Sequence, residues 1–245
     1  MSVNLHALRR HMLQFVRRGM KRRPGIPGAT VVLLPLLVAL VGYWGYGEYN
    51  KRQLPRTVSA LVRDASLRLQ DALKRDSDAA AANPESARRL DQHVDAVNGH
   101  LLKLRAMDTA AIEGFAAAAD DYLLTTREIL RRRASDYRYR MALSESTRAL
   151  RDHMRSDNHT GAWVTHAVQM KDRMEADYRD YRLTTEALAT LLELFPDSRA
   201  RLVPYMDPAL LADESVVSAA RSRALESFRK KTADVERVGQ LSAYR

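Results

Sequence analysis

The chain has 245 residues, a formal net charge of +10 at pH 7 and no cysteine. The lack of cysteine excludes disulfides, thiolate metal sites and a thiol nucleophile. The positive charge by itself would favour a nucleic-acid partner. However, the part of the chain after residue 25 contains 33 of the 40 bases and all 30 acids, so its charge is nearly balanced. We therefore expect no nucleic-acid partner. The other seven bases stand in the first 25 residues, where there is no acid; they are Arg9, Arg10, Arg17, Arg18, Lys21, Arg22 and Arg23.

A long apolar run, Ile26 to Tyr46, follows this basic segment. Its length suits a helix that crosses a bilayer core about 30 Å thick, so we expect residues 26–47 to form a transmembrane anchor. The alternative is a cleaved signal peptide, whose apolar part is usually about 7–15 residues long and precedes a small-residue cleavage site. Here the run is longer and ends in aromatic residues typical of a membrane interface, namely Tyr43, Trp44, Tyr46 and Tyr49.

The basic segment, residues 1–25, sets the expected orientation. A segment rich in Lys and Arg beside a transmembrane span usually stays in the cytoplasm, where its bases can contact anionic lipid headgroups. The five nearest to the span are Arg17, Arg18, Lys21, Arg22 and Arg23. We therefore predict a single-pass protein with a cytoplasmic N-terminus and an exported domain over residues 48–245. The excess of arginine over lysine and the abundant alanine suggest a GC-rich bacterial genome, which would place the chain in an inner membrane with that domain in the periplasm.

The exported domain is poor in turn formers. Only four of the ten glycines follow residue 47, and no sustained apolar–polar alternation occurs. Long amphipathic helices are therefore favoured over strands. We predict an all-α fold: an antiparallel helical bundle with coiled-coil-like seams, formed as one bundle or as a short hairpin followed by a longer distal bundle.

Two helices are expected first. Residues 54–75 carry an inward stripe at three- and four-residue steps, formed by Val58, Leu61, Ala65, Leu69 and Ala72. A second helix is expected to start at Asn83-Pro84-Glu85, where an N-cap precedes a proline at the first helical position. Its seam is Leu90, Val94, Val97, Leu101 and Leu104. The short connection predicts an antiparallel pair.

A third helix is expected to start at Asp108, a suitable N-cap, with the stripe Ile112, Ala116, Ala119, Leu123, Leu130, Ala134, Tyr137 and Met141. The spacing slips near residues 144–147, which leaves open a bend, a break or a stutter. Polar residues 156–161 indicate a turn.

The fourth helix has the seam Val164, Ala167, Met174, Tyr178, Tyr181, Leu188, Leu192 and Phe195, and Pro196 is expected to end it. A last helix follows Asp207-Pro208, with Leu210, Val217, Ala220, Ala224, Phe228, Val235 and Val238 inward.

One candidate docking patch stands in the third helix, where bases alternate with tyrosines: Arg131, Arg132, Arg133, Arg138 and Arg140. Bases interleaved with aromatic residues can bind phosphate or an acidic partner. The favoured interpretation is a solvated helix face, because Glu128 with Arg132 and Asp136 with Arg140 form i,i+4 pairs. The tyrosines would then lie partly in the core.

No catalytic, cofactor or metal site is expected. His93 and His100 share a helical face, but two turns, about 10.5 Å, separate them, too far for one ion. The sequence has no phosphate-binding glycine loop, nucleophile elbow or His-Glu-x-x-His helix. Few loops are available to hold catalytic groups, so an enzyme is the class we expect least.

The unbroken seams favour a structural function. We expect a membrane-anchored periplasmic scaffold or interaction subunit of a cell-envelope complex, whose partners are the bilayer, other membrane or periplasmic proteins, or a second copy of itself. The alternative is a small-ligand sensor, because the layout resembles the periplasmic four-helix input domains of bacterial chemoreceptors. Those receptors return through a second membrane helix, whereas here the most apolar later stretch, Leu183 to Phe195, contains two glutamates and is too short to span.

Overall fold

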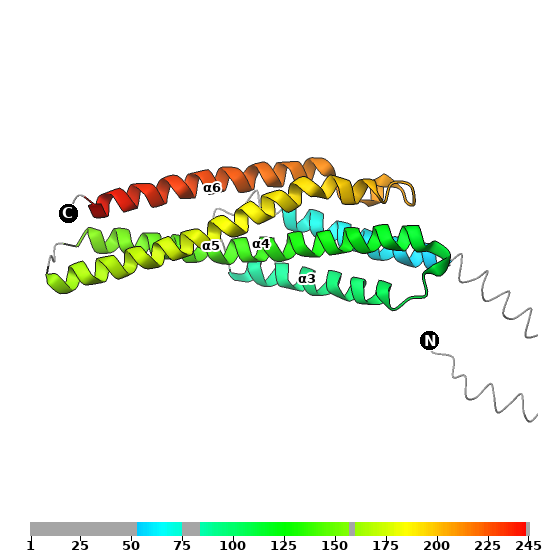
Figure 1. Cartoon of the computed structure of the whole chain (residues 1–245), viewed down its shortest axis with the longest axis horizontal. Coiled ribbons are helices and arrows are strands. Elements are labelled where there is room, and N and C mark those ends of the chain that lie inside the picture. The colour runs from blue at the N-terminus through cyan, green and yellow to red at the C-terminus, as the bar shows by residue number, and fades with distance from the viewer. Residues whose placement is uncertain (1–52, 75–83, 157–159, 244–245) are drawn as a thin grey trace, which may run out of the picture. The chain divides into compact units, whose positions relative to one another are not determined.

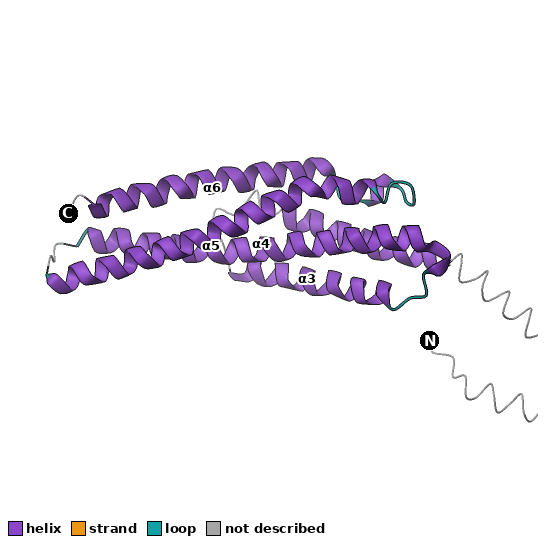
Figure 2. Cartoon of the chain, in the orientation of Figure 1, coloured by secondary structure: helices purple, strands orange, loops and turns teal. Residues whose placement is uncertain are grey.

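The computed structural model describes residues 53–74, 84–156 and 160–243. These ranges form five α-helices and two short 3-10 helices and contain no strand, so the all-α prediction is confirmed (Figures 1 and 2). The elements are a helix over residues 53–74, α3 (Pro84–Arg105), η2 (Ala110–Ile112), α4 (Glu113–Met154), α5 (Gly161–Ala200), η3 (Pro208–Leu210) and α6 (Glu214–Ala243). None of the helices in these ranges is both long enough and apolar enough to cross a membrane. The expected anchor, residues 26–47, lies outside them.

The helix over residues 53–74 and α3 form the predicted antiparallel pair. His100 Nε2 lies 2.6 Å from Asp64 Oδ2, and His93 Nε2 lies 3.4 Å from Asp71 Oδ2. The later residue of one helix thus contacts the earlier residue of the other, so the two helices run in opposite directions. The expected inward positions of both helices are buried or half-buried. The seam spacing therefore identified both the helices and the faces that meet.

α4 is one continuous helix of 42 residues. The expected slip in its spacing is real, but it neither breaks nor ends the helix. The buried stripe of the first part of α4 reaches Tyr137, and the next buried apolar residue is Leu143. An α-helix has 3.6 residues per turn, so a step of six residues is not close to a whole number of turns. The side of α4 that faces inward therefore changes between these two residues. Each part of α4 therefore faces a different hydrophobic core.

The described residues form two hydrophobic cores. The first core contains residues of all five described helices, among them Leu69, Leu101, Leu123, Leu188 and Val217. The second core contains residues of α4, α5 and α6 alone, among them Leu143, Leu150, Met174, Tyr181 and Val238. α5 packs along both α4 and α6, and α3 packs on α4 (Figure 1). The second core is thus enclosed by fewer helices than the first.

Pro196 does not end α5, so that prediction is wrong. A proline inside a helix removes one backbone hydrogen bond and costs about 3 kcal/mol in isolation. Tertiary contacts around it offset this cost. The Phe195 ring packs against Tyr122 at a centroid distance of 5.4 Å, and Ser198 Oγ donates to Asp121 Oδ2 at 2.9 Å. These contacts stabilise one further turn after the proline.

The start of α5 also differs from the predicted seam. Val164, which was expected to point inward, is exposed. Trp163 packs on the second core instead, and its ring stacks on His153 at a centroid distance of 4.8 Å. Thr160 is the N-cap of α5, since its side chain accepts a hydrogen bond from the Trp163 amide. The bulk of the indole and its stacking partner set the rotation of this first turn.

Candidate functional site

The five arginines of the candidate docking patch all stand on α4, but they do not share one surface. Arg131 and Arg132 are exposed, and Arg131 Nη1 lies 3.7 Å from Glu128 Oε1. Arg138 is also exposed and forms an ion pair with Asp91 of α3. Arg140 is half-buried, and Arg133 is inside the bundle. An acidic partner at the exposed arginines stays a prediction.

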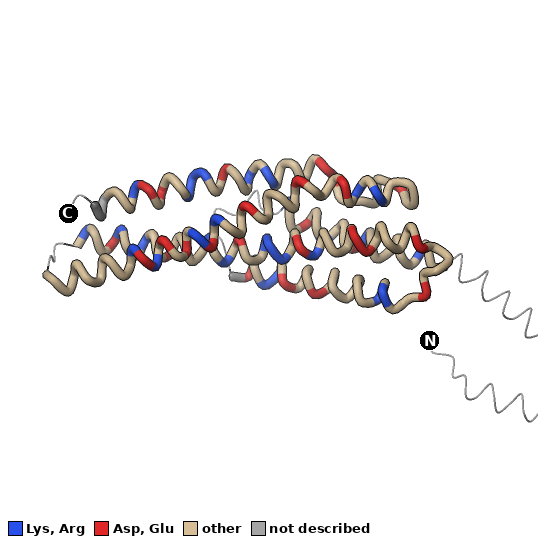
Figure 3. Tube along the Cα trace, viewed as in Figure 1, with Lys and Arg blue, Asp and Glu red and all other residues tan. Residues whose placement is uncertain are grey.

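The expected ion pairs of this segment are replaced by others. Glu128 pairs with Arg127 and Arg131 instead of Arg132. Asp136 pairs with Arg133 instead of Arg140, because its carboxylate points into the bundle. Basic and acidic residues are interspersed along the described helices (Figure 3).

A buried polar layer separates the two cores. Arg133 Nη1 donates to Asp136 Oδ2 at 3.2 Å, and Thr185 Oγ1 of α5 donates to Asp136 Oδ1 at 2.9 Å. Arg133 and Asp136 are each 2% exposed. Burial lowers the pKa of the Arg133 guanidinium, although Asp136 opposes that shift. The layer therefore holds a charge pair that water does not reach.

Tyrosines surround this layer. Arg133 and Arg140 both lie over the ring of Tyr137, at 5.1 and 4.5 Å from its centroid. Tyr181 of α5 is buried beside them, and burial, together with the charge of Asp136, raises the pKa of its hydroxyl. Tyr178 is half-buried and its hydroxyl lies 3.1 Å from Thr232 Oγ1 of α6. Tyr137, Tyr178 and Tyr181 therefore face inward as expected, whereas Tyr139, the other tyrosine of the α4 segment, is exposed.

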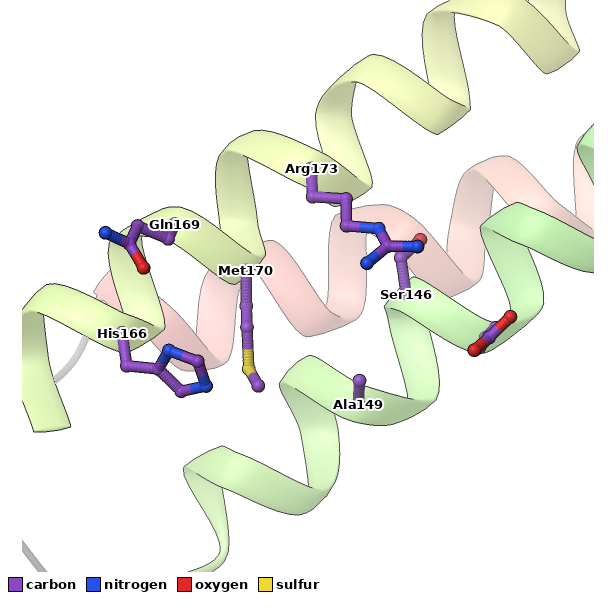
Figure 4. A pocket seen from close by; sticks show the side chains of 7 residues that line it. Ser146, Ala149, His166, Gln169, Met170 and Arg173 are labelled. Carbon is purple, nitrogen blue, oxygen red and sulfur yellow. The ribbon is translucent and has the colours of Figure 1, made fainter.

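A cleft of about 270 Å³ opens between α4 and α5 beside the second core. α4 contributes Glu145, Ser146 and Ala149 to its wall, and α5 contributes His166, Gln169, Met170 and Arg173. In Figure 4 the Met170 side chain points toward α4, and the Arg173 guanidinium lies near Ser146. The cleft thus combines an apolar floor with one acid, one base and one imidazole at its rim.

The histidines of α3 contact carboxylates of the neighbouring helix. Arg68 Nη1 donates to His93 Nδ1 at 3.4 Å, which leaves the proton of that ring on Nε2, facing Asp71. His100 Nε2 donates to Asp64 Oδ2, which also accepts a hydrogen bond from Arg68 Nε at 2.6 Å. In the described ranges no three His, Asp or Glu side chains gather closely enough to hold a metal ion.

Several predicted site residues lie outside the described ranges. These are the topology-determining bases Arg17, Arg18, Lys21, Arg22 and Arg23 and the interfacial aromatics Tyr43, Trp44, Tyr46 and Tyr49.

The buried position of Arg133 was missed, although the sequence contained a signal for it. Arg133 follows Leu130 by three residues and precedes Tyr137 by four, so it stands on the apolar stripe itself. A charged residue on such a stripe indicates a buried ion pair within the same bundle. The cleft between α4 and α5 left no comparable signal, because its walls come from two helices with no conspicuous motif.

Comparison of the chain with protein-family models, with curated proteins and with solved structures gives no match. We therefore infer the function from the helices, their surfaces and their buried charges.

Proposed function

We propose that the chain is a membrane-anchored, periplasmic helical subunit that binds another protein of the cell envelope. The observation that carries this proposal is an exposed apolar stripe on α5. Leu183 and Leu194 are 54% and 52% exposed, and the half-buried Ala187 and Leu191 stand between them. Steps of four, four and three residues place all four on one side of the helix.

Such a stripe is more than scattered surface hydrophobicity. Single exposed apolar residues are common, whereas several along one helix face are typical of a surface that meets another protein. Leu191 also packs against the first core, so Leu183 and Leu194 are the main exposed members. A partner helix can cover the stripe with its own apolar face, as in other helix pairs. The apolar run Ile26 to Tyr46 and the bases before it support the anchor and the orientation.

Affinity purification tests this function. The full-length chain is crosslinked in intact membranes, solubilised in mild detergent and purified, and we expect one stoichiometric partner. Leu183→Glu with Leu194→Glu should abolish its recovery, because two charges in an apolar interface are costly to bury. Leu102→Glu is the matched control, since Leu102 is 62% exposed on α3, off the stripe. Equal recovery of the partner with the double variant and with this control would refute the proposal.

A second function, small-ligand sensing, is favoured by the cleft between α4 and α5. Its volume of about 270 Å³ is close to the lower limit of known ligand pockets, about 300 Å³. Met170 supplies an apolar surface, and Glu145 and Arg173 supply opposite charges for orienting a polar molecule. A thermal-shift screen of small metabolites tests it. A hit should lose its effect in Met170→Trp, which fills the cleft, and a screen without hits would count against sensing.

A further inference from the structure

The outward face of the helix over residues 53–74 carries a regular row of exposed side chains. While the inward stripe of this helix packs in the first core, its exposed positions before residue 70 are Arg56, Ala60, Arg63 and Leu67. Steps of four, three and four residues place them on one side of the helix, at the spacing of a coiled-coil seam. We call these four residues the outer row. The helix therefore presents a second seam to solvent.

A groove of about 570 Å³ lies between the outer row and η3. All four residues of the outer row line it, and Leu210 supplies the wall that comes from η3. Leu67 is 55% exposed, so the groove offers apolar surface that water now covers. The other lining residues are Pro55, Ser59 and Asp64.

The wall formed by η3 is fixed to the rest of the bundle. Gln70 Nε2 donates to the Leu211 carbonyl at 3.4 Å, and the Ala212 amide donates to the Tyr122 hydroxyl at 3.2 Å. Leu211 and Ala212 are 3% and 0% exposed. The groove is therefore already formed in the free chain, and a ligand need not bear the cost of ordering it.

The groove is basic. Arg56 and Arg63 are exposed, and no described residue forms an ion pair with either of them. Asp64 is the acid of the groove, but it already binds Arg68 Nε at 2.6 Å and His100 Nε2 at 2.6 Å. The two arginines thus leave an excess of positive charge along the outer row. Such a surface complements a partner that carries acids.

The shape of the groove suits an elongated ligand. The outer row extends over eleven residues, or about 16.5 Å along the helix, which is about three helical turns. Its side chains are exposed, so a small molecule there would keep much of its surface in water, whereas bound small ligands usually bury about 70–90% of theirs. A helix laid along the row would contact all four residues, because its own side chains recur at the same spacing.

We propose that the groove between the outer row and η3 binds an acidic amphipathic helix of a partner protein. Apolar side chains of that helix pack on Ala60, Leu67 and Leu210. Its carboxylates pair with Arg56 and Arg63. In this mode of recognition the apolar anchors supply affinity and the charges supply selectivity. The groove is a different surface from the apolar stripe on α5, so it goes beyond the proposed function and does not depend on it.

Fluorescence anisotropy of labelled synthetic peptides tests the groove, with the full-length chain in neutral detergent. The acidic peptide is an amphipathic helix about three heptads long, with leucine on one face and glutamate on both sides of that face. The basic peptide has lysine in place of each glutamate. We expect saturable binding of the acidic peptide that salt weakens, and binding of the basic peptide that is weaker by about tenfold or more. Equal affinities for the two peptides would overturn the proposal without any variant.

Reversal of charge locates the binding. Arg56→Glu with Arg63→Glu should make the chain prefer the basic peptide, because the groove then carries acids. Misfolding cannot produce such a gain of binding. Arg88→Glu with Arg229→Glu is the matched control, since it reverses two exposed arginines on α3 and α6 with the same change in net charge. An unchanged preference in the first variant, or the same reversal in the control, would overturn the proposal.

The apolar part of the groove has its own variant. Leu67→Ser should weaken binding of the acidic peptide by about tenfold, because the leucine no longer covers apolar surface of the peptide. Leu102→Ser is the control, since Leu102 is 62% exposed on α3. Equal binding by these two variants would overturn the proposal. Leu183→Glu with Leu194→Glu should leave peptide binding unchanged, so loss of the α5 partner and loss of the groove are distinguishable.

Two measurements cover other occupants of the groove. Sedimentation of the full-length chain would detect a dimer, and one that is lost with Arg56→Glu and Arg63→Glu would show that a second copy fills the groove. Displacement of the acidic peptide by phosphatidylglycerol but not by phosphatidylcholine would show that a lipid headgroup does. We expect neither result, and either one would overturn the partner helix.

Discussion

Thr185 donates a 2.9 Å hydrogen bond to Asp136 in the interior of the bundle and so joins α5 to α4. The second carboxylate oxygen of Asp136 accepts a hydrogen bond from Arg133 at 3.2 Å. All three side chains are buried. A buried pair of charges contributes little net stability when intact, because desolvation offsets the attraction, but breaking it leaves one charge buried.

Removing the charge of Asp136 should therefore be costly. Asp136→Asn is expected to lower the free energy of unfolding by about 3–5 kcal/mol, measured by urea unfolding of the full-length chain in detergent. The double variant Arg133→Met with Asp136→Leu should lose less, because no charge is left inside. Asp152→Asn is the control, since its pair with Arg148 is exposed and is worth at most about 1 kcal/mol. Similar losses in the two Asp→Asn variants would contradict the buried-pair account.

Tyr122 connects three parts of the first core. Its hydroxyl lies 2.8 Å from Ser66 Oγ and accepts a hydrogen bond from the Ala212 amide at 3.2 Å. Burial raises the pKa of this hydroxyl, so it stays protonated at pH values where an exposed tyrosine ionises.

Tyr122→Phe should lower the free energy of unfolding by about 1–3 kcal/mol, because the buried Ala212 amide loses its acceptor. Chemical denaturation followed by circular dichroism measures the change. Tyr205→Phe removes a hydroxyl from a half-exposed ring and should be nearly neutral. A neutral Tyr122→Phe would mean that the amide finds another acceptor.

Most inward faces were predictable from the sequence because they depend on local spacing, but two helix starts were not: α4 begins at Glu113 instead of Asp108, and α6 begins at Glu214 instead of directly after Pro208. The seam from Leu90 to Leu104 and the inward positions of α6 from Val217 to Val238 needed no information from elsewhere in the chain, whereas Leu210, expected in the same helix, belongs to η3. By contrast, the continuation of α5 through Pro196 depends on Phe195 and Ser198 meeting α4, and such contacts have no local signature. Tertiary packing outweighs local preference at these positions.

The candidate site was less predictable than the fold. The sequence singled out Arg131, Arg132, Arg133, Arg138 and Arg140 as one patch because they are neighbours along the chain. In a helix, neighbours along the chain point in different directions, so the structure distributes these side chains between solvent and interior. Asp136, which binds Arg133, also accepts a hydrogen bond from Thr185 of α5. Thr185 and Asp136 are 49 residues apart in the sequence. Pairings across helices of this kind require the fold to be known.

The hydrogen bonds of Asp64 predict a pH dependence of stability. Burial alone would raise the pKa of this carboxyl, but hydrogen bonds from Arg68 and His100 outweigh it and lower the pKa below 3.8. A lowered folded-state pKa stabilises the fold above the unfolded value, and this contribution is lost as the pH falls through the folded value. Asp64 therefore stabilises the pair of helices at neutral and mildly acidic pH, and this stabilisation is lost only as the pH falls through the lowered pKa of the folded state.

Asp64→Asn should be less stable than wild type at about pH 5, and the difference should shrink toward about pH 2.5, as thermal unfolding at stepped pH would show. Asp95→Asn is the control, because Asp95 is exposed on α3. We expect it to show no such convergence. A difference for Asp64→Asn that stays constant down to the lowest pH would contradict the lowered pKa.

The orientation of the chain in the membrane can be tested through the basic residues before Ile26. We expect that replacing Arg17, Arg18, Lys21, Arg22 and Arg23 with acids weakens or inverts the topology, because in the proposed orientation these bases hold the N-terminus in the cytoplasm. A reporter that is active only on the far side of the membrane, fused after Arg245, measures the outcome as loss of activity. Replacing the exposed Arg131 and Arg132 of α4 with acids is the control: it alters bases far along the chain from the span and should leave the reporter active. Full reporter activity in the N-terminal variant would show that the bases do not set the orientation.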